Sequence, residues 1–145
     1  EKIQDIIWAI NSGNDSWEQL LVKLHRYAAD LLDSQGISYT LNIPQQISLP
    51  PLKMEERRNL WLIYKELITN IARHSHASHA RISLSLERDT LHLAVQDDGI
   101  GFDPEQASHR NGLKNIKKRT EEMGGNWEVK AVPGKGARWR IEFEL

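Results

Sequence analysis

The part of this sequence that most restricts its fold is residues 66–102, in which a helix-like segment is followed by two alternating segments and a glycine-bearing turn. In the helix-like segment, Glu66, Asn70 and His74 recur every four residues and therefore lie on one side of a helix. The apolar residues beside them recur at the spacing of a core-facing stripe: Leu60, Ile63, Tyr64, Leu67 and Ile71. The polar row therefore lies at the edge of a buried face, where a carboxylate, a carboxamide and an imidazole could hold a metal ion and a phosphate.

The segments after this helix predict an antiparallel hairpin with one buried face. Residues 80–86 and 91–95 are apolar at every second position, on either side of a tight turn. The second strand ends at Asp97, just before Gly99 and Gly101, and two glycines let a backbone approach a ligand closely. A single Asp-Gly turn, like a single polar helix face, is usually structural. Further glycine segments at 112 and at 134–136 make a shared binding site the better interpretation.

The rest of the chain divides into further helices and strands. Four segments have a helical apolar stripe. The first is 3–10, the second is capped by Asp15 and ended by Gly36, the third begins near Met54, and the fourth is 112–123. The alternating segments are 37–43, 80–86, 91–95, 127–131 and 139–143. Residues 44–51 are interpreted as a linker. Residues 103–111 have no apolar periodicity, and we expect a mobile loop there.

Composition excludes several classes of protein. With 145 residues the chain is long enough for one main domain, and its formal charge of -1 offers no general attraction for nucleic acid or anionic lipid. It has no cysteine, so thiol nucleophiles, thiolate metal sites and disulfides are excluded, which fits a reducing compartment. No apolar run approaches the roughly 20 residues of a membrane span. We expect a cytoplasmic location without direct membrane contact.

Two other groups of residues invite a functional interpretation. His74, His76 and His79 are close in sequence, as zinc ligands often are, but no obvious fourth ligand accompanies them, and we expect no zinc site. The five tryptophans fit the apolar stripes, so core packing is the favoured explanation for them.

Taken in order, the polar and glycine motifs resemble those of the nucleotide-binding domain of sensor histidine kinases. This domain belongs to the ATP-binding (GHKL) superfamily that includes gyrase, Hsp90-type chaperones and MutL. Residues 66–74 resemble the N box, and 97–102, 111–116 and 134–137 resemble the three glycine boxes. The resemblance covers residues 47–145 and is closest to the subfamily of nitrate sensors and the bacillar lipid-fluidity sensor. It implies a two-layer α/β sandwich of the Bergerat type, with a mixed sheet covered by helices on one face.

The resemblance also implies roles for individual residues toward ATP and Mg2+. Asn70 would coordinate the Mg2+ that bridges the phosphates, Glu66 would orient or deprotonate the attacking histidine, and Asp97 would accept a hydrogen bond from the adenine amino group. The other residues that it places against the nucleotide are Arg73, His74, Gly99, Gly101, Gly112, Leu113, Gly134, Gly136 and Ala137.

Three residues depart from the family pattern. Arg110 stands where the family usually has the first glycine of the second glycine box. The replacement affects the flexibility that we expect of the lid, the loop next to this box that covers the nucleotide in the family. Ala137 replaces a frequent threonine and removes a hydroxyl near the adenine. Asp98 replaces a common asparagine, and we expect it to add a negative charge at the mouth of the pocket.

The resemblance implies partners beyond the nucleotide. We interpret residues 1–12 as the tail of a dimerisation helix and residues 13–145 as the catalytic domain. The phosphoacceptor histidine would lie on upstream dimerisation helices, because His25 is followed by Arg26 rather than by an acidic residue and lies on the wrong helix. The full-length protein would be a homodimer and would pass the phosphate to a response regulator, and this chain would be the cytosolic portion of a membrane-bound sensor.

Two alternative functions remain open on the sequence. One is a serine protein kinase of the anti-sigma-factor type, which has the same fold. The other is a nucleotide-binding interaction module that binds ATP without transferring its phosphate.

Overall fold

The computed structural model describes residues 3–10, 16–107 and 111–145. The elements follow one another in the order α1 (Ile3–Ile10), α2 (Trp17–Ser34), β1 (Ser38–Asn42), α3 (Met54–Asn70), η2 (Ile71–Ser75), β2 (His79–Glu87), β3 (Thr90–Asp97), α4 (Pro104–Ala107), α5 (Asn111–Glu122), β4 (Asn126–Ala131) and β5 (Ala137–Glu144). None of the helices among these residues has the length and apolar character that crossing a membrane requires.

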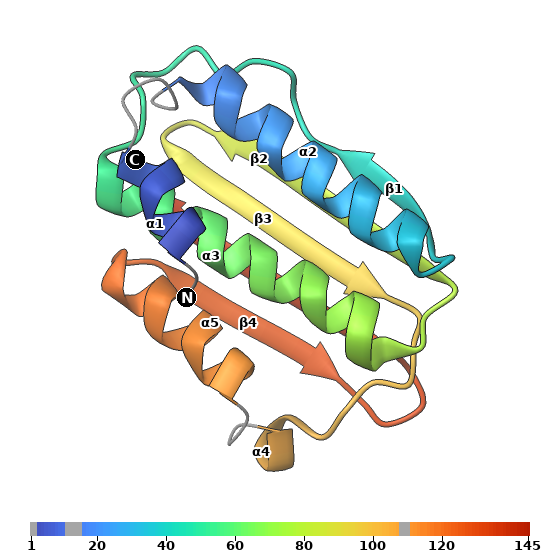
Figure 1. The fold of residues 1–145 in the computed structure, drawn as a ribbon. Coiled ribbons are helices and arrows are strands. Elements are labelled where there is room, and N and C mark those ends of the chain that lie inside the picture. The colour runs from blue at the N-terminus through green and yellow to red at the C-terminus, as the bar shows by residue number, and fades with distance from the viewer. Residues whose placement is uncertain (1–2, 11–15, 108–110) are drawn as a thin grey trace.

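The strands form one sheet, and the longer helices cover one of its faces (Figure 1). The strand order is β1-β2-β3-β5-β4, with β1 parallel to β2 and every other pair antiparallel. Figure 1 shows α2, α3 and α5 lying across this face, with α1 against α3. This arrangement confirms the predicted two-layer α/β sandwich with a mixed sheet.

The alternating patterns of the sequence explain which face is covered. Side chains of the central strands point alternately to the helices and away from them. Those that point to the helices are buried: Ala80, Ile82, Leu84, Leu91, Leu93, Val95, Trp139, Ile141 and Phe143. Those on the opposite, bare face include Arg81, Ser83, Ser85, His92, Ala94 and Arg140. The core therefore lies between the sheet and α2, α3 and α5.

Two boundaries differ from the sequence expectation. The N-cap of α2 is Ser16, whose hydroxyl accepts a hydrogen bond from the amide of Gln19 at 3.2 Å, whereas the expected cap Asp15 lies outside the described residues. Residues 104–107 of the expected loop form the short helix α4. Pro104 suits a first helical position, and the Asp103 carboxylate accepts from the amide of Glu105 at 3.0 Å. Asp103 and Pro104 together are a helix-start signal, and the expectation of a loop overlooked it.

The helix that carries the polar row does not end as a regular α-helix. It continues from α3 into the π-helical turn η2, which ends at His76 in the left-handed region with φ of 53°. π-Helical turns are rare and occur often at functional sites. Periodicity did not predict this turn, because it ends the helix and too few helical residues follow it to reveal a change of period.

Candidate nucleotide site

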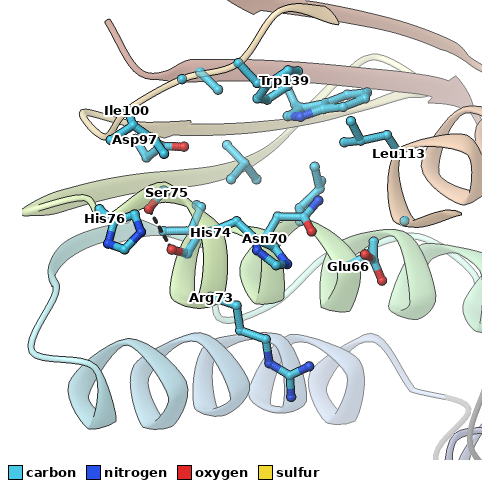
Figure 2. Close-up of a pocket in the computed structure, with 17 residues that line it drawn as sticks. Glu66, Asn70, Arg73, His74, Ser75, His76, Asp97, Ile100, Leu113 and Trp139 are labelled. Carbon is cyan, nitrogen blue, oxygen red and sulfur yellow. Dashed lines mark hydrogen bonds between the residues drawn. The ribbon is translucent and has the colours of Figure 1, made fainter. Parts of the chain in front are cut away.

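A cavity of about 260 Å³ lies between α3, η2, the end of β3, the start of β5 and the start of α5 (Figure 2). We call it the first cavity. Nine of the twelve predicted site residues line it: Glu66, Asn70, Arg73, His74, Asp97, Gly101, Gly112, Leu113 and Ala137. Its size is close to the lower end of the range for small-molecule sites. Three predicted residues, Gly99, Gly134 and Gly136, are not in its lining.

Asp97 is the last residue of β3 and is paired with Ala80 of β2 and Ala137 of β5. Its Oδ1 accepts a hydrogen bond from the amide of Gly99 at 2.8 Å. Burial raises the pKa of Asp97, and the hydrogen bond from Gly99 only partly offsets this effect. Its Oδ2 has no hydrogen-bond partner in the described part of the chain. A half-buried carboxylate with one uncommitted oxygen is suited to accept a hydrogen bond from an amino group.

The glycines that are absent from the lining hold the surrounding loops together. A side chain on Gly99 would collide with the backbone carbonyl of Ser75, and one on Gly136 would collide with that of Asp97. The amide of Gly134 donates to the carbonyl of Ile100 at 2.5 Å. Gly99 and Gly136 thus permit close backbone contacts next to the cavity, and a direct contact of the three glycines with a ligand stays a prediction.

Ser75 joins η2 to the glycine turn, a role that was not predicted. Its buried hydroxyl donates to the carbonyl of Ile71 at 2.6 Å and accepts from the amide of Ala77 at 3.0 Å. Its own carbonyl accepts from the amide of Ile100 at 2.7 Å. The signal in the sequence was weak, because a serine at the end of a helix is usually a local cap.

Asp98 carries its negative charge next to Asp97 and is held by backbone amides. Its Oδ1 accepts from the amides of Ser78 at 2.8 Å and His79 at 2.9 Å, and these hydrogen bonds, that of His79 foremost, lower the pKa of Asp98. It therefore fastens the start of β2 to the glycine turn. Asp98 is absent from the lining of the first cavity, but its negative charge contributes to the raised pKa of Asp97. Its effect at the mouth of the pocket stays a prediction.

The polar row of α3 faces the start of α5. Figure 2 shows Glu66 and Asn70 on the side of the helix next to the cavity, whereas Arg73 points away from Asp97 and Trp139. Glu66 lies so close to Gly112 that its carboxylate oxygen Oε1 fills the space of a Cβ atom there. The carboxylate of α3 and the first turn of α5 are thus in direct contact.

The donor set offers oxygen ligands for a hard cation and no ready-made metal cage. Within the described residues, no group of three or more His, Cys, Asp and Glu side chains could hold a metal ion by itself. Asn70 and Glu66 supply a carboxamide and a carboxylate to one cavity, which fits Mg2+, since this ion usually takes few protein oxygens together with substrate phosphates. The His79 ring lies apart, 3.0 Å from Ser38 Oγ and 3.2 Å from Thr40 Oγ1.

Apolar side chains complete the cavity and were not predicted as site residues. They are Leu67, Ile71, Val95, Ile100, Phe102 and Trp139. Trp139 was interpreted as core packing, and it is indeed buried, but it also lines the cavity. The alternation of β5 contained the signal, because Trp139 shares a face with Ala137, the direct partner of Asp97.

A family model described as "Histidine kinase-, DNA gyrase B-, and HSP90-like ATPase" matches residues 55–145. The chain belongs to this ATPase family. The match confirms the resemblance found in the sequence and identifies the first cavity as lying in an ATP-binding domain. All the cavity residues named above fall within the matched range.

Relatives and solved structures extend the comparison of this ATPase domain. It is 32% identical over 117 residues to the sensor histidine kinase LiaS of Bacillus subtilis, covering 80% of this chain and 32% of LiaS. It is 33% identical over 97 residues to the sensor histidine kinase ComP of the same species, covering 65% of this chain and 13% of ComP. The chain therefore spans a third or less of these relatives.

The solved structures that resemble this chain are less than 25% identical to it in sequence, so they show a shared fold. The histidine kinase domain of a blue-light activated histidine kinase from Erythrobacter litoralis superimposes with a TM-score of 0.74 at 17% identity, covering 98% of this chain and 69% of that chain. The histidine kinase AdeS of Acinetobacter baumannii gives 0.69 at 18% identity, covering 98% and 76%.

Proposed function

We propose that this ATPase domain is the catalytic domain of a two-component sensor histidine kinase. It would transfer the γ-phosphoryl group of ATP to a histidine that lies outside these 145 residues, on a dimerisation segment. One observation carries the proposal: Asp97 at the end of β3 and Glu66 with Asn70 on α3 line the same cavity. The residue proposed to recognise the base and the residues proposed to act in phosphoryl transfer therefore line the same cavity.

Asp97 would select adenine. Its Oδ2 would accept a hydrogen bond from the exocyclic amino group, while the hydrogen bond from Gly99 fixes Oδ1. Guanine has an oxo group at the corresponding position, and two acceptors facing each other repel. The base would rest against Trp139 and Ile100, and the sugar and phosphates would extend toward Asn70 and the start of α5.

The phosphates would be held by the polar end of the cavity. Gly112 and Leu113 lie in the first turn of α5, where backbone amides and the helix dipole favour an anion. Asn70 would provide a neutral oxygen ligand for Mg2+, which when bound neutralises phosphate charge. Glu66 would accept a proton from the attacking imidazole. Positioning and charge neutralisation supply most of the rate enhancement in reactions of this class.

The wider context is proposed from the relatives, whose names identify them as sensor kinases. The full-length protein would be a homodimer. The phosphate would pass from the histidine to an aspartate of a response regulator.

Calorimetric titration tests the proposal directly. ATP, ADP and GTP are titrated into the wild-type domain and into the Asp97→Asn and Asn70→Ala variants, with and without Mg2+. We expect adenine-selective binding that is lost in Asp97→Asn and loses its Mg2+ dependence in Asn70→Ala. Absence of adenine-nucleotide binding by the wild-type domain would contradict the proposal. Phosphate transferred to a supplied acceptor should be acid-labile, since acid-stable phosphate would indicate a serine kinase instead.

A further inference from the structure

The bare face of the sheet carries its charges in a fixed order along the strands. The strand register groups its side chains into four rows that cross β2, β3, β5 and β4. In order, the rows are Arg81, Gln96, Arg138 and Lys130; Ser83, Ala94, Arg140 and Glu128; Ser85, His92, Glu142 and Asn126; and Glu87, Thr90 and Glu144. With His92 counted as neutral, the formal charge falls from +3 in the first row to -2 in the fourth.

Strand β5 repeats this order within a single column of side chains. Arg138, Arg140, Glu142 and Glu144 alternate with buried apolar residues and therefore point to the bare face. The column thus consists of two cations followed by two anions. A second copy of the column, turned end for end, would place Arg138 opposite Glu144 and Arg140 opposite Glu142.

Strand β2 fits the same rotation. Arg81 lies in the first row and Glu87 in the fourth, and both side chains are exposed. A two-fold axis that crosses the strands between the second and third rows exchanges the first row with the fourth. Each strand then faces its own copy, so the axis that matches the charges of β5 also brings Arg81 opposite Glu87.

Most of these charges have no permanent partner in their own molecule. Arg81, Arg138 and Arg140 form no ion pair with any residue that the structure describes. In the same part of the chain, the carboxylates of Glu87 and Glu142 pair only with the imidazole of His92, at 3.9 and 3.3 Å, and only while that ring is protonated. The charges of β2 and β5 are therefore available to a partner.

The middle of the β5 column projects beyond its neighbours. A hollow of about 570 Å³ lies beside Arg140 and Glu142, and its lining includes the short side chains of Ser83, Ser85 and Ala94 on β2 and β3. Arg140 and Glu142 are exposed, whereas Ser83 and Ala94 are half-buried. A molecule that lies on this face therefore meets the long side chains of β5 first.

We propose that the bare face of the sheet is a salt-dependent docking surface for a second copy of this domain, with the two sheets face to face and their strands antiparallel. Such a two-fold contact is formed by the same patch on both copies, and this patch is complementary to itself. A partner of uniform charge, such as a nucleic acid or an anionic lipid surface, would be repelled at one end of the face.

The size of the face predicts a weak association. Four strands about 4.8 Å apart and about seven residues of roughly 3.3 Å each outline roughly 450 Å² per copy. About 900 Å² in total is less than a standard stable interface buries, so the contact should form only at high local concentration. The first cavity lies on the helix-covered side of the sheet and stays open in this arrangement. The inference goes beyond the proposed kinase function and does not depend on it.

Sedimentation equilibrium of the domain and of two charge-reversed variants tests the contact. The wild-type dissociation constant should rise at least about fivefold between about 50 and about 300 mM salt. Arg138→Glu/Arg140→Glu gives β5 four anions, and Glu142→Arg/Glu144→Arg gives it four cations. Each variant alone should dissociate at least about tenfold more readily than the wild type, because like charges then face each other.

The decisive sample is an equal mixture of the two variants. Four anions then face four cations, so a mixed dimer should regain the wild-type affinity or exceed it. Lys114→Glu/Lys118→Glu is the matched control, because it makes the same change of net charge at exposed positions of α5. Its dissociation constant should stay within about twofold of the wild-type value. Circular dichroism verifies that each variant is folded.

Cross-linking gives a second measurement in which the charges of β5 stay intact. The chain has no cysteine, so Ala94→Cys and His92→Cys each introduce a single thiol on β3. In the proposed arrangement, position 94 of one copy lies opposite position 92 of the other. A short bismaleimide should join these two variants much faster at low salt than at high salt, and much faster than it joins Ala94→Cys to Lys114→Cys.

Several results would overturn the proposal. They are a wild-type domain that stays monomeric at millimolar concentration, a mixture of charge-reversed variants that associates no better than its components, or equal cross-linking to positions 92 and 114. None of these measurements involves ATP, so they are separate from a failure of the proposed kinase function.

Discussion

The carboxylate of Glu66 occupies the space that a side chain on Gly112 would need. Gly112 is not among the glycines with positive φ, so its backbone conformation is open to any residue. The constraint on this position therefore comes from a side chain of a neighbouring helix and not from its own backbone conformation. A residue in the second glycine box is in this way tied to a residue in the N box, although 46 positions separate Glu66 from Gly112.

Gly112→Ala should separate nucleotide binding from phosphoryl transfer. The new methyl group pushes the Glu66 carboxylate aside, which is easy because that group ends a flexible side chain. A displaced proton acceptor should lower the rate of transfer by on the order of 100-fold, while the ATP affinity changes little. Single-turnover transfer to a histidine peptide and calorimetry measure the two effects.

Stability measurements identify the cause of that loss. Alanine is more favourable than glycine inside a helix by up to about 1 kcal/mol. Gly112→Ala should therefore raise the free energy of unfolding more in a Glu66→Ala background than in a Glu66→Gln background. The glutamine side chain still fills the space that the new Cβ atom at position 112 needs, whereas alanine leaves it empty. Equal gains in the two backgrounds would show that Glu66 and Gly112 are not coupled.

Asp97→Asn should stabilise the nucleotide-free domain while abolishing recognition of adenine. Burial raises the pKa of Asp97 in the folded state, so the ionised carboxylate opposes folding at pH values above that pKa. The asparagine variant should accordingly melt a few degrees higher near neutral pH. This difference should vanish as the pH falls below the unfolded-state value of 3.8. Calorimetric scans at several pH values test the sign, with exposed Glu128→Gln as the control. A lower melting temperature at neutral pH would contradict the assignment.

Ala137→Thr should tighten ATP binding. Ala137 is the direct strand partner of Asp97 and lines the first cavity, so a hydroxyl at this position would lie beside the base or a water molecule bound to it. One added hydrogen bond is worth about 0.5–1.5 kcal/mol, or roughly two- to tenfold in affinity. Ala137→Val has the same shape without the hydroxyl and should give no gain. A gain of the same size with valine would point to packing instead.

Asp5→Ala should detach α1 from α3. Asp5 is 7% exposed, and its carboxylate accepts hydrogen bonds from Trp61 Nε1 at 3.0 Å and Lys65 Nζ at 2.7 Å. Removing it leaves both donors unpaired, which should cost about 1–3 kcal/mol. Next to Asp5, Lys23 Nζ lies 4.8 Å from the ring of Trp8 and 4.4 Å from that of Trp61, so tryptophan fluorescence should change as well.

Acid should weaken the same attachment. Burial alone would raise the pKa of Asp5, but the hydrogen bonds from Lys65 and Trp61 outweigh it, and the pKa is lowered. The stabilising effect of Asp5 is therefore present above 3.8 and is lost as the pH falls through the lower folded-state value. The stability difference between wild type and Asp5→Ala should shrink over this acidic range, whereas exposed Glu144→Ala should show no comparable difference at any pH. A difference that stays constant with pH would contradict the role of the charge.

Sequence periodicity predicted the elements well because the sheet has one bare and one covered face. In such a sheet and its covering helices, each element is buried on one side only. This one-sided burial produces the alternation around Leu93 and Ile141 and the helical stripe around Leu67. The motifs likewise predicted most of the first cavity, since groups such as Asp97 and Gly101 are close in sequence.

The rest depended on contacts that no local pattern contains. The buried hydrogen bond from Trp61 to Asp5 joins residues 56 positions apart, and neither residue belongs to the N box or to a glycine box. The role of Ser75 depends on the carbonyl and amide groups of a distant turn. Trp139 was correctly placed in the core, but periodicity cannot distinguish a core residue from one that borders a cavity.

The order of the strands has a consequence for the release of the spent nucleotide. Asp97 ends the middle strand of the sheet, which is bonded to a neighbour on each side. Glu66 and Gly112 lie on the helices α3 and α5, which pack against each other without the hydrogen-bond ladder that joins neighbouring strands. Small helix shifts need fewer bonds broken than parting two strand ladders. We therefore expect ADP to leave phosphates first and base last, so that the dwell time of ADP is set at Asp97 and not at the site of chemistry.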